Sequence, residues 1–277
     1  MAQSSLSSET SVQYEYSIQF VQRCADEFQW KDLSEDVVMD IGCGDELNCC
    51  KAILMQFPEV KELIAVDADI TVFETAHFRN RIEFFVCDIE ERDSLKSYEG
   101  KVDKVISTST FHQIKDKEMA FRNVYRLLKP GGEAGFFFCV NSCIYTFLTV
   151  LSEIPKYGIT LEDIFSHNLY PTEHGEQYYK ELLEKIGFKD VRATEKERRL
   201  PYDTEEDFEE IFIEGLVNNF EISREDSETF KAEVLELFEK TFGRYEGKLC
   251  YVSVHLNLFG VKPMESSDFK SKETTVV

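Results

Sequence analysis

Short apolar runs alternate with amphipathic stretches along the first half of the chain. The runs are typical of strands buried in a parallel sheet, and the stretches between them repeat apolar residues at helical spacing. We predict strands that end near Asp40, Asp67, Asp88, Thr108 and Val140. Because strands and helices alternate, the pattern predicts an α/β fold with an open sheet that is covered by helices on both faces.

The amphipathic stretches predict helices before and between these strands. An N-terminal helix is expected over residues 11–30, lying over the site that the strand ends form. Further helices are expected near residues 47–57, 70–78 and 116–128. The last of these begins at the capping acid Asp116 and stops at Lys129-Pro130-Gly131-Gly132.

The alternation breaks after Val140. Helical inserts are predicted near residues 141–175 and 200–246, and we expect the first of them, with helices at 144–151 and 161–165, directly over the strand ends. Between the inserts lie a helix at residues 176–186 and a strand at 188–197, which is expected to form a hairpin with a last strand at 249–259. The domain boundaries that follow are a helical segment at 1–30, a main domain at 31–262 and a disordered tail at 263–277.

The composition narrows the possible partners. With 277 residues and 43% hydrophobic content, the chain can bury one sizeable core. A net charge of −22 argues against a nucleic-acid partner, because phosphate binding needs concentrated Lys and Arg. Residues 1–10 are polar, and no later apolar run approaches the roughly 20 residues of a membrane span. We therefore expect a soluble, cytoplasmic protein without membrane insertion, and the pattern leaves monomer and homodimer open.

Eight cysteines are scattered along the chain. Without a secretory signal, the context for disulfides is missing. The spacings Cys139-x-x-x-Cys143 and Cys49-Cys50 also lack the paired arrangement of zinc ligands. We expect reduced, mostly buried thiols and no metal site.

Acids close three of the predicted strands. Asp40, Asp67 and Asp88 would lie at the carboxyl ends of parallel strands, where open α/β sheets bind ligands. Each acid alone is equally compatible with a strand-end turn. Together with the turn Gly42-Cys43-Gly44, they predict a ligand site in which Asp67 accepts from ribose hydroxyls and Asp88 from an adenine amino group.

A dinucleotide is disfavoured at this site. The G-x-G-x-x-G pattern uses its third glycine for helix packing and leaves the helix N-terminus open to a pyrophosphate. Here Gly44 is followed by Asp45-Glu46-Leu47, so two carboxylates would face the phosphates. A nicotinamide cofactor is therefore not expected.

These motifs resemble those of a known enzyme class. Asp40-x-Gly42-x-Gly44, Asp67, Cys87-Asp88-Ile89 and Leu127-Leu128-Lys129-Pro130-Gly131-Gly132 together resemble class I S-adenosylmethionine-dependent methyltransferases over roughly residues 30–140. The resemblance implies a Rossmann-like, seven-stranded sheet with an antiparallel last strand, and S-adenosyl-L-methionine as cofactor. Within the class, the N-terminal helix, Phe121-Arg122-Asn123 and the insert after Cys139 are similar to the juvenile hormone acid O-methyltransferases of arthropods.

The resemblance also implies roles for individual residues. The methionine part of the cofactor would meet Asp40, Gly42 and Gly44, the ribose would meet Asp67, and the adenine would meet Asp88 and Ile89, with Cys43, Ala68, Cys87 and Ser107 also in the cofactor site. Gln13 falls where the family has a glutamine that orients the substrate carboxylate. An exposed helix glutamine is the alternative for this position.

The acceptor side departs from the family pattern. Where the family has His-Trp after the fourth strand, this chain has His112-Gln113, so Gln113 replaces the tryptophan that is expected to pack against the acid. His112 would be the base for a hydroxyl acceptor, or else a strand-end histidine bonded to backbone. The insert residues Ile144, Tyr145 and Leu148 would wall a lipophilic chain, or else belong to an ordinary core.

We therefore expect an O-methyltransferase that converts a lipophilic carboxylic acid, of the farnesoic or juvenile hormone acid type, to its methyl ester. A carboxylate is already a nucleophile, so the site needs only to align it and exclude water, with Gln13 donating to the oxygen that does not attack. Two alternatives stay open. One is a methyltransferase for a hydroxyl- or amine-bearing small molecule with His112 as base, and the other is a catalytically degenerate homologue that binds the cofactor.

Overall fold

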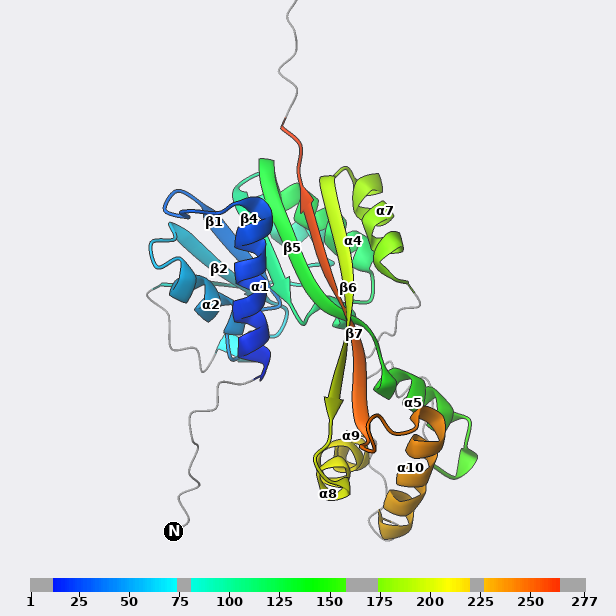
Figure 1. Ribbon diagram of the computed structural model, residues 1–277. Helices are drawn as coiled ribbons and strands as arrows, with labels where there is room; N and C mark the ends of the chain where they lie inside the picture. Colours follow the sequence, from blue (N-terminus) through cyan, green and yellow to red (C-terminus); the bar gives the residue numbers. More distant parts are fainter. Residues whose placement is uncertain (1–11, 74–80, 158–173, 220–226, 265–277) are drawn as a thin grey trace, which may run out of the picture.

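A mixed sheet of seven strands forms the centre of the protein in the computed structural model, which describes residues 12–73, 81–157, 174–219 and 227–264 (Figure 1). The strands are β1 (Val37–Ile41), β2 (Glu62–Asp67), β3 (Glu83–Val86), β4 (Val102–Thr108), β5 (Leu128–Ser142), β6 (Lys189–Pro201) and β7 (Cys250–Val261). Their order is β3-β2-β1-β4-β5-β7-β6. β1 to β5 pair in parallel, and β7 is antiparallel to both neighbours, which confirms the predicted sheet.

Helices cover both faces of this sheet. On one face lie α1 (Val12–Phe28) and α2 (Asn48–Gln56), and on the other lie α3 (Arg92–Leu95), α4 (Lys117–Leu127) and α7 (Glu176–Ile186) (Figure 1). Successive strand residues point to opposite faces, so Val38 packs with α1 and α2 while Met39 packs with α4 and α7. The same alternation turns Asp40 toward α2, which decides its role below.

The helix expected near residues 70–78 is short. A 3₁₀ turn, η1 (Ile70–Phe73), occupies its start, and residues 74–80 lie outside the described part. The helix predicted at 161–165 and almost all of the tail predicted at 263–277 also lie outside it.

β6 and β7 continue past the rest of the sheet and carry a second group of helices (Figure 1). We call α5 (Cys143–Ser152), α8 (Glu205–Phe208), α9 (Glu214–Asn219) and α10 (Ser227–Phe242) the helical lobe. α5 follows β5 directly, so the lobe begins where the parallel strands end. Its apolar residues pack against one another in a separate core, with Phe147, Phe208 and Phe238 fully buried. The expectation that the first insert lies directly over the strand ends is therefore wrong for α5.

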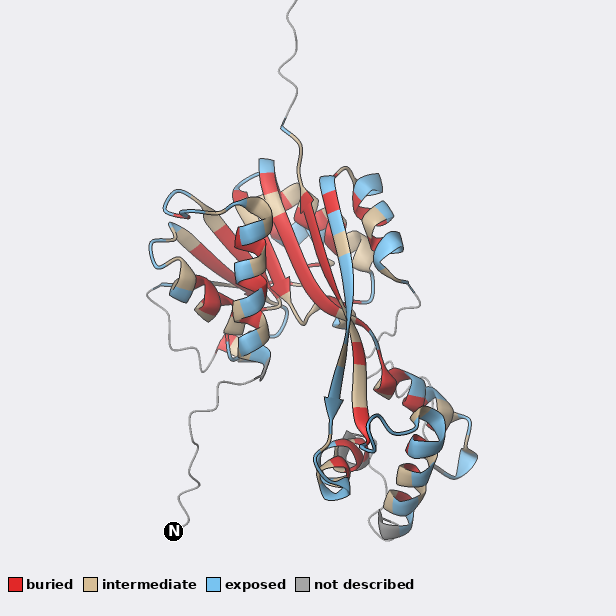
Figure 2. Ribbon diagram, viewed as in Figure 1, coloured by how far each residue is buried: buried red, intermediate tan, exposed pale blue. Residues whose placement is uncertain are grey.

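β6 is longer than predicted. It pairs with β7 from Lys189 opposite Val261 to Pro201 opposite Cys250. Residues 195–199 are all charged, and they fit an edge strand that is exposed along most of its length (Figure 2). Charge on both faces hides the apolar alternation from which a strand is recognised.

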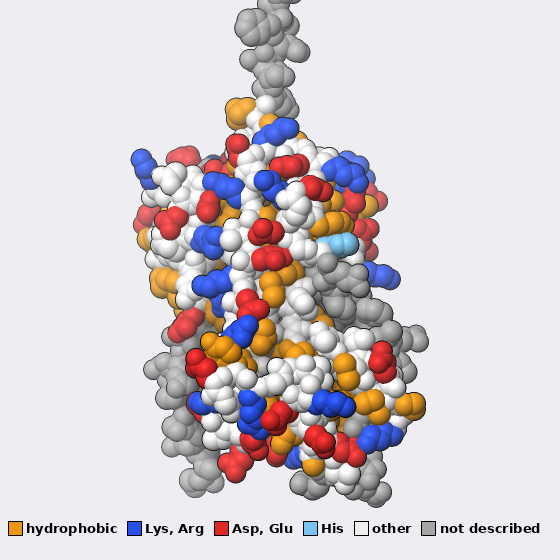
Figure 3. Space-filling model, turned by 45° about the vertical axis from the view of Figure 1, so that its right-hand side comes forward, with side chains coloured by type: hydrophobic (Ala, Val, Ile, Leu, Met, Phe, Trp, Pro, Cys, Tyr) orange, Lys and Arg blue, Asp and Glu red, His pale blue; other side chains and the backbone are white. Residues whose placement is uncertain are grey.

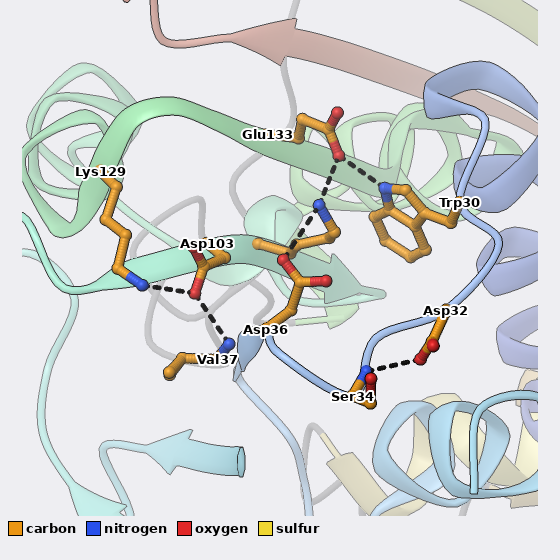
Figure 4. Close-up of polar contacts among 9 residues, drawn as sticks. Trp30, Asp32, Ser34, Asp36, Val37, Asp103, Lys129 and Glu133 are labelled. Atoms are coloured by element: carbon orange, nitrogen blue, oxygen red, sulfur yellow. Dashed lines mark hydrogen bonds and ion pairs between the residues drawn. The ribbon is translucent and has the colours of Figure 1, made fainter. Parts of the chain in front are cut away.

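An ion-pair network fixes the amino ends of the central strands (Figure 4). Lys104 on β4 lies 3.0 Å from Glu133 on β5 and 3.5 Å from Asp36 before β1. Glu133 also accepts the indole N–H of Trp30. Asp103 accepts Lys129 at 2.7 Å and the backbone N–H of Val37 at 2.9 Å, so these charges connect β1, β4 and β5 at the end of the sheet away from the ligand site.

All eight cysteines are free thiols, and seven of them are buried, as predicted. In the described ranges, no helix is both long and apolar enough to cross a bilayer.

Candidate active site

A cavity of about 1070 Å³ opens at the carboxyl ends of β1 to β4. Its walls come from α1, from the loops after these four strands, and from the 3₁₀ turn η3 (Phe111–Gln113). Of the predicted site residues, the following line it: Gln13, Gly42, Cys43, Gly44, Asp67, Ala68, Cys87, Asp88, Ile89, His112 and Gln113. The volume is that of a small-molecule site.

The turn after β1 is shaped by two glycines. Gly42 and Gly44 have φ of +70° and +62°, a conformation that side chains with Cβ rarely adopt. The N–H groups of Gly42 and Cys43 both donate to the Val66 carbonyl, at 2.8 and 3.1 Å. Thr110 donates its hydroxyl to the Gly42 carbonyl at 2.9 Å, so this turn is tied to β2 and to the loop after β4.

Asp67 at the end of β2 is held by backbone bonds. Its two carboxylate oxygens accept the N–H groups of Gly44 at 3.0 Å and Asp69 at 3.1 Å. Asp88 after β3 accepts the Glu90 N–H at 2.8 Å. Because these bonds fix each carboxylate while leaving further lone pairs, both acids can still accept hydrogen bonds from a ligand in the cavity.

A hydrogen bond from α4 supports the loop on the adenine side of the predicted site. Asn123 on α4 is buried and donates its side-chain amide to the Ile89 carbonyl at 2.7 Å. The amide thereby fixes the loop that carries Cys87, Asp88 and Ile89 along the cavity wall.

Two predicted cofactor residues do not line the cavity. Asp40 is fully buried behind the glycine turn, where it accepts the Cys50 thiol at 3.2 Å, and burial raises its pKa to about 7. Ser107 is also buried and donates to the Ile41 carbonyl at 2.7 Å. Both side chains lie inside the fold, since Asp40 is two residues short of the level of Asp67 and Ser107 is bonded to the carbonyl just before Gly42.

The side of the cavity where the acceptor is expected carries neutral polar groups. Gln13 stands exposed at the start of α1, and Ser17, one turn later, lies 3.3 Å from the Thr108 hydroxyl. His112 and Gln113 complete this side from η3. Burial, with a smaller effect of Lys117, lowers the pKa of His112 to about 4, so its imidazole is neutral near pH 7 and a weak base.

The three insert residues are not brought to this cavity. Ile144 and Leu148 belong to the core of the helical lobe, and Tyr145 is buried on the same helix. Their helical spacing is that of packing within the lobe, so the prediction that they line the cavity wall is wrong.

The prediction from sequence missed several lining residues. Ser17, Thr108, Ser109, Thr110 and Glu90 all face the cavity. Only Ser17 carried a usable signal, since it lies one helical turn after Gln13 on the same face of α1. The loop after β4 includes Ser109 at φ +56°, a conformation that no local pattern announces.

The Asp, Glu, Lys and Arg side chains that line the cavity are all acidic among the described residues. Within the described ranges, six residues with carboxylates line the cavity: Asp45, Glu46, Asp67, Asp69, Asp88 and Glu90. No Lys or Arg is among the lining residues in the described part of the chain. Such a site favours a cationic ligand and opposes a pyrophosphate, in agreement with the missing third glycine.

Comparison with known proteins identifies the domain. Residues 39–136 match a family model described as a methyltransferase domain. The chain carries a methyltransferase domain. The methyltransferase is 26% identical to juvenile hormone acid O-methyltransferase of Bombyx mori over 233 residues, which cover 82% of each chain.

Solved structures share the fold of this methyltransferase. The YcgJ protein of Bacillus subtilis matches with a TM-score of 0.59 at 16% identity, covering 90% of this chain and 99% of that one. Haemonchus contortus phosphoethanolamine N-methyltransferase 2, solved with S-adenosylhomocysteine, matches with a TM-score of 0.53 at 17% identity, covering 90% and 53%. The class I methyltransferase fold predicted from the glycine turn and the strand-end acids is confirmed.

Proposed function

We propose that this methyltransferase transfers a methyl group from S-adenosylmethionine to the carboxylate of a lipophilic acid, of the farnesoic or juvenile hormone acid type. The observation that carries the proposal is the contrast between the two sides of the cavity. Asp67 and Asp88 lie at the strand ends where the cofactor is expected, whereas Gln13, Ser17, His112 and Gln113 offer neutral hydrogen-bonding groups to the acceptor.

The cofactor side suits S-adenosylmethionine. The cofactor supplies a methyl group that is already activated on a positively charged sulfur. Asp67 can accept from the ribose hydroxyls, and Asp88 from the adenine amino group, with Ile89 as an apolar wall. The carbonyls of the Gly42–Gly44 turn are suited to an ammonium group, and the net negative lining stabilises the cation as a whole.

The acceptor side suits a group that needs no base. A hydroxyl or amine must lose a proton as it is methylated, and His112, with a pKa lowered to about 4, takes up that proton poorly near pH 7. A carboxylate has no proton to lose. Gln13 can donate its amide to one carboxylate oxygen and so orient the other toward the methyl group.

The similarity to the Bombyx mori enzyme extends over most of both chains and supports an acid as the acceptor. Gln113 stands where the resemblance predicts a tryptophan. The Gln113 amide can donate a second hydrogen bond to the acceptor carboxylate. A tryptophan at this position would donate through its ring N–H.

The test is transfer of labelled methyl from S-adenosylmethionine to farnesoic acid, shorter fatty acids and hydroxylated terpenoids. The native chain is compared with Gln13→Ala and with Gln19→Ala, an exposed glutamine on the same helix that does not line the cavity. Loss of a hydrogen bond to a charged group predicts about a 10- to 100-fold lower kcat/KM for Gln13→Ala. Gln19→Ala should keep the native rate.

Methylation of the hydroxylated terpenoids in preference to every acid would contradict the proposal and favour the reading with His112 as base. Binding of S-adenosylmethionine without turnover of any acceptor in the panel would favour a degenerate homologue.

A further inference from the structure

The charge of the cavity poses a problem for an anionic acceptor. Six carboxylates of the described residues line it, and the whole chain carries a net charge of −22. A second anion entering such a site is repelled unless a cation lies close to its carboxylate. Lys and Arg are mixed with Asp and Glu over the visible face of the molecule, so this face has no broad positive surface (Figure 3).

Arg198 on β6 is a cation without an acidic partner near this region. Its guanidinium carbon lies 3.7 Å from the ring centre of Tyr16 and 5.4 Å from that of Phe137. The neighbouring Arg199 is paired with Glu197 at 2.6 Å. Among the described residues, no carboxylate forms an ion pair with Arg198, although acids outnumber bases in the chain.

The strand geometry directs Arg198 toward α1. Arg192, six residues earlier and on the same face of β6, contacts the C-terminal end of α1 through Glu27 at 3.0 Å and Phe28. Arg198 contacts the N-terminal end of the same helix through Tyr16. The face of β6 that carries both arginines therefore runs along α1.

This end of α1 is the acceptor side of the cavity. Gln13 and Ser17 line the cavity. Tyr16 lies one turn after Gln13 and next to Ser17. The other ring under Arg198 belongs to Phe137, whose carbonyl accepts the N–H of the cavity residue Ser109 at 2.7 Å. Arg198 does not itself line the cavity, but the two rings that hold it belong to residues that adjoin the lining residues Ser17 and Ser109.

Stacking on a ring leaves the edge of a guanidinium free. All five N–H donors lie in that plane, and the fork they form matches a carboxylate. The two aromatic rings hold the group near the acceptor side without neutralising its charge.

We infer that Arg198 binds the carboxylate of the acceptor and sets the preference of the enzyme for anionic over neutral acceptors. The inference rests on the proposed function and names a residue outside the methyltransferase motifs. Gln13 orients the carboxylate through one hydrogen bond, and Arg198 supplies the charge that offsets the acidic lining.

The test is equilibrium binding to protein saturated with S-adenosylhomocysteine, measured by titration calorimetry with farnesoic acid and with farnesol, its neutral counterpart. The native chain is compared with Arg198→Met, Arg198→Lys and the adjacent control Arg199→Met. We expect Arg198→Met to bind the acid about 10-fold or more weakly, with unchanged affinity for farnesol and for S-adenosylhomocysteine. Arg198→Lys should regain part of the loss, because it keeps the charge without the fork.

Methyl transfer gives a second readout. Arg198→Met should raise KM for farnesoic acid and leave kcat at saturating acid close to native, since the residue acts on binding and not on the methyl group. If Arg198→Met does not melt cooperatively, Arg198→Gln, which keeps length and polarity, replaces it.

The outcomes separate the two proposals. If the native chain methylates the acid and Arg198→Met does so with the same KM as Arg199→Met, only the role of Arg198 is overturned. If Arg198→Met loses affinity for the acid and for farnesol equally, Arg198 has only a packing role, and the inference about Arg198 is also overturned. If the native chain neither methylates farnesoic acid nor prefers it to farnesol, the proposed function fails, and this inference fails with it.

Discussion

Replacing Gly42 by alanine should damage the cofactor site far more than the same change at Gly44. Both glycines have positive φ, so each alanine costs about 1–2 kcal/mol of backbone strain. At Gly42 the new Cβ would also lie 2.1 Å from Cγ2 and 2.3 Å from Oγ1 of Thr110, whereas at Gly44 no atom lies within 4 Å. Forcing a methyl group into such a contact costs a further 1–3 kcal/mol, roughly, so we expect about 2–5 kcal/mol for Gly42→Ala.

The comparison isolates packing against Thr110, because the strain is common to both variants. Thermal unfolding of the two ligand-free variants measures this packing cost, and for a chain of this size each 1 kcal/mol lowers Tm by about 2–4 °C. Calorimetric titration with S-adenosylhomocysteine should show Gly42→Ala losing affinity as well, since a displaced Thr110 no longer fixes the Gly42 carbonyl.

A third variant checks the mechanism. Thr110→Ser removes Cγ2, the nearest of the clashing atoms, so Gly42→Ala combined with Thr110→Ser should be less destabilised than the sum of the single changes. Equal Tm values for Gly42→Ala and Gly44→Ala, or strict additivity with Thr110→Ser, would refute the reasoning.

Three further changes test the supports of the site. Because burial raises the Asp40 pKa from 3.8 to about 7, the native state holds a proton that the unfolded chain releases. The stabilisation from this proton is complete below pH 3.8 and lost as pH rises through 7. The free energy of unfolding of Asp40→Asn, measured in urea, should therefore rise by on the order of 4 kcal/mol relative to native between pH 4 and pH 8. Parallel pH profiles of the two proteins would contradict this. Asp67→Asn should weaken S-adenosylhomocysteine binding about 10-fold or more, because an amide oxygen cannot accept both backbone bonds and a ribose hydroxyl. Glu133→Gln should lower the free energy of unfolding by about 1–3 kcal/mol and leave cofactor affinity unchanged, because Lys104 and Glu133 are only 13% and 18% exposed. The control Asp93→Asn should cost almost nothing, because Asp93 and Lys96 are 89% and 62% exposed.

The sequence was most informative where one pattern has one structural solution. A short apolar run closed by a polar residue leaves little choice but a buried parallel strand, and the ends of β1, β2 and β4 were predicted to within one residue. The turn itself needs positive φ at Gly42 and Gly44, so its place was also readable. β6 was cut short because charged residues fit an exposed edge strand and a loop equally well.

Asp40 shows why a strand-end acid is an ambiguous signal. Asp40 and Asp67 look alike in sequence, each closing an apolar run. Asp67 is the last residue of β2 and turns into the cavity, whereas Asp40 is followed by one more strand residue and points toward Cys50 on α2. Asp40 pairs with Ala65, so the two acids lie on the same face of the sheet and Asp67 lies two residues nearer the carboxyl ends of the strands. That depth along the strand, which the sequence does not give, decides between a cavity contact and a buried support.

The acceptor side was least predictable because it is assembled from segments far apart in the chain. The apolar spacing of Ile144 and Leu148 correctly indicates a buried face, but spacing cannot tell whether that face meets a ligand or α10. Arg198 presents the converse case, since nothing near it in the sequence distinguishes it from Arg199. Only the pairing of β6 with β7, and the course of β6 along α1, bring Arg198 to the rings beside Gln13. The expected cofactor contacts therefore lie in a local motif, whereas the proposed acceptor contacts come together only in the folded chain.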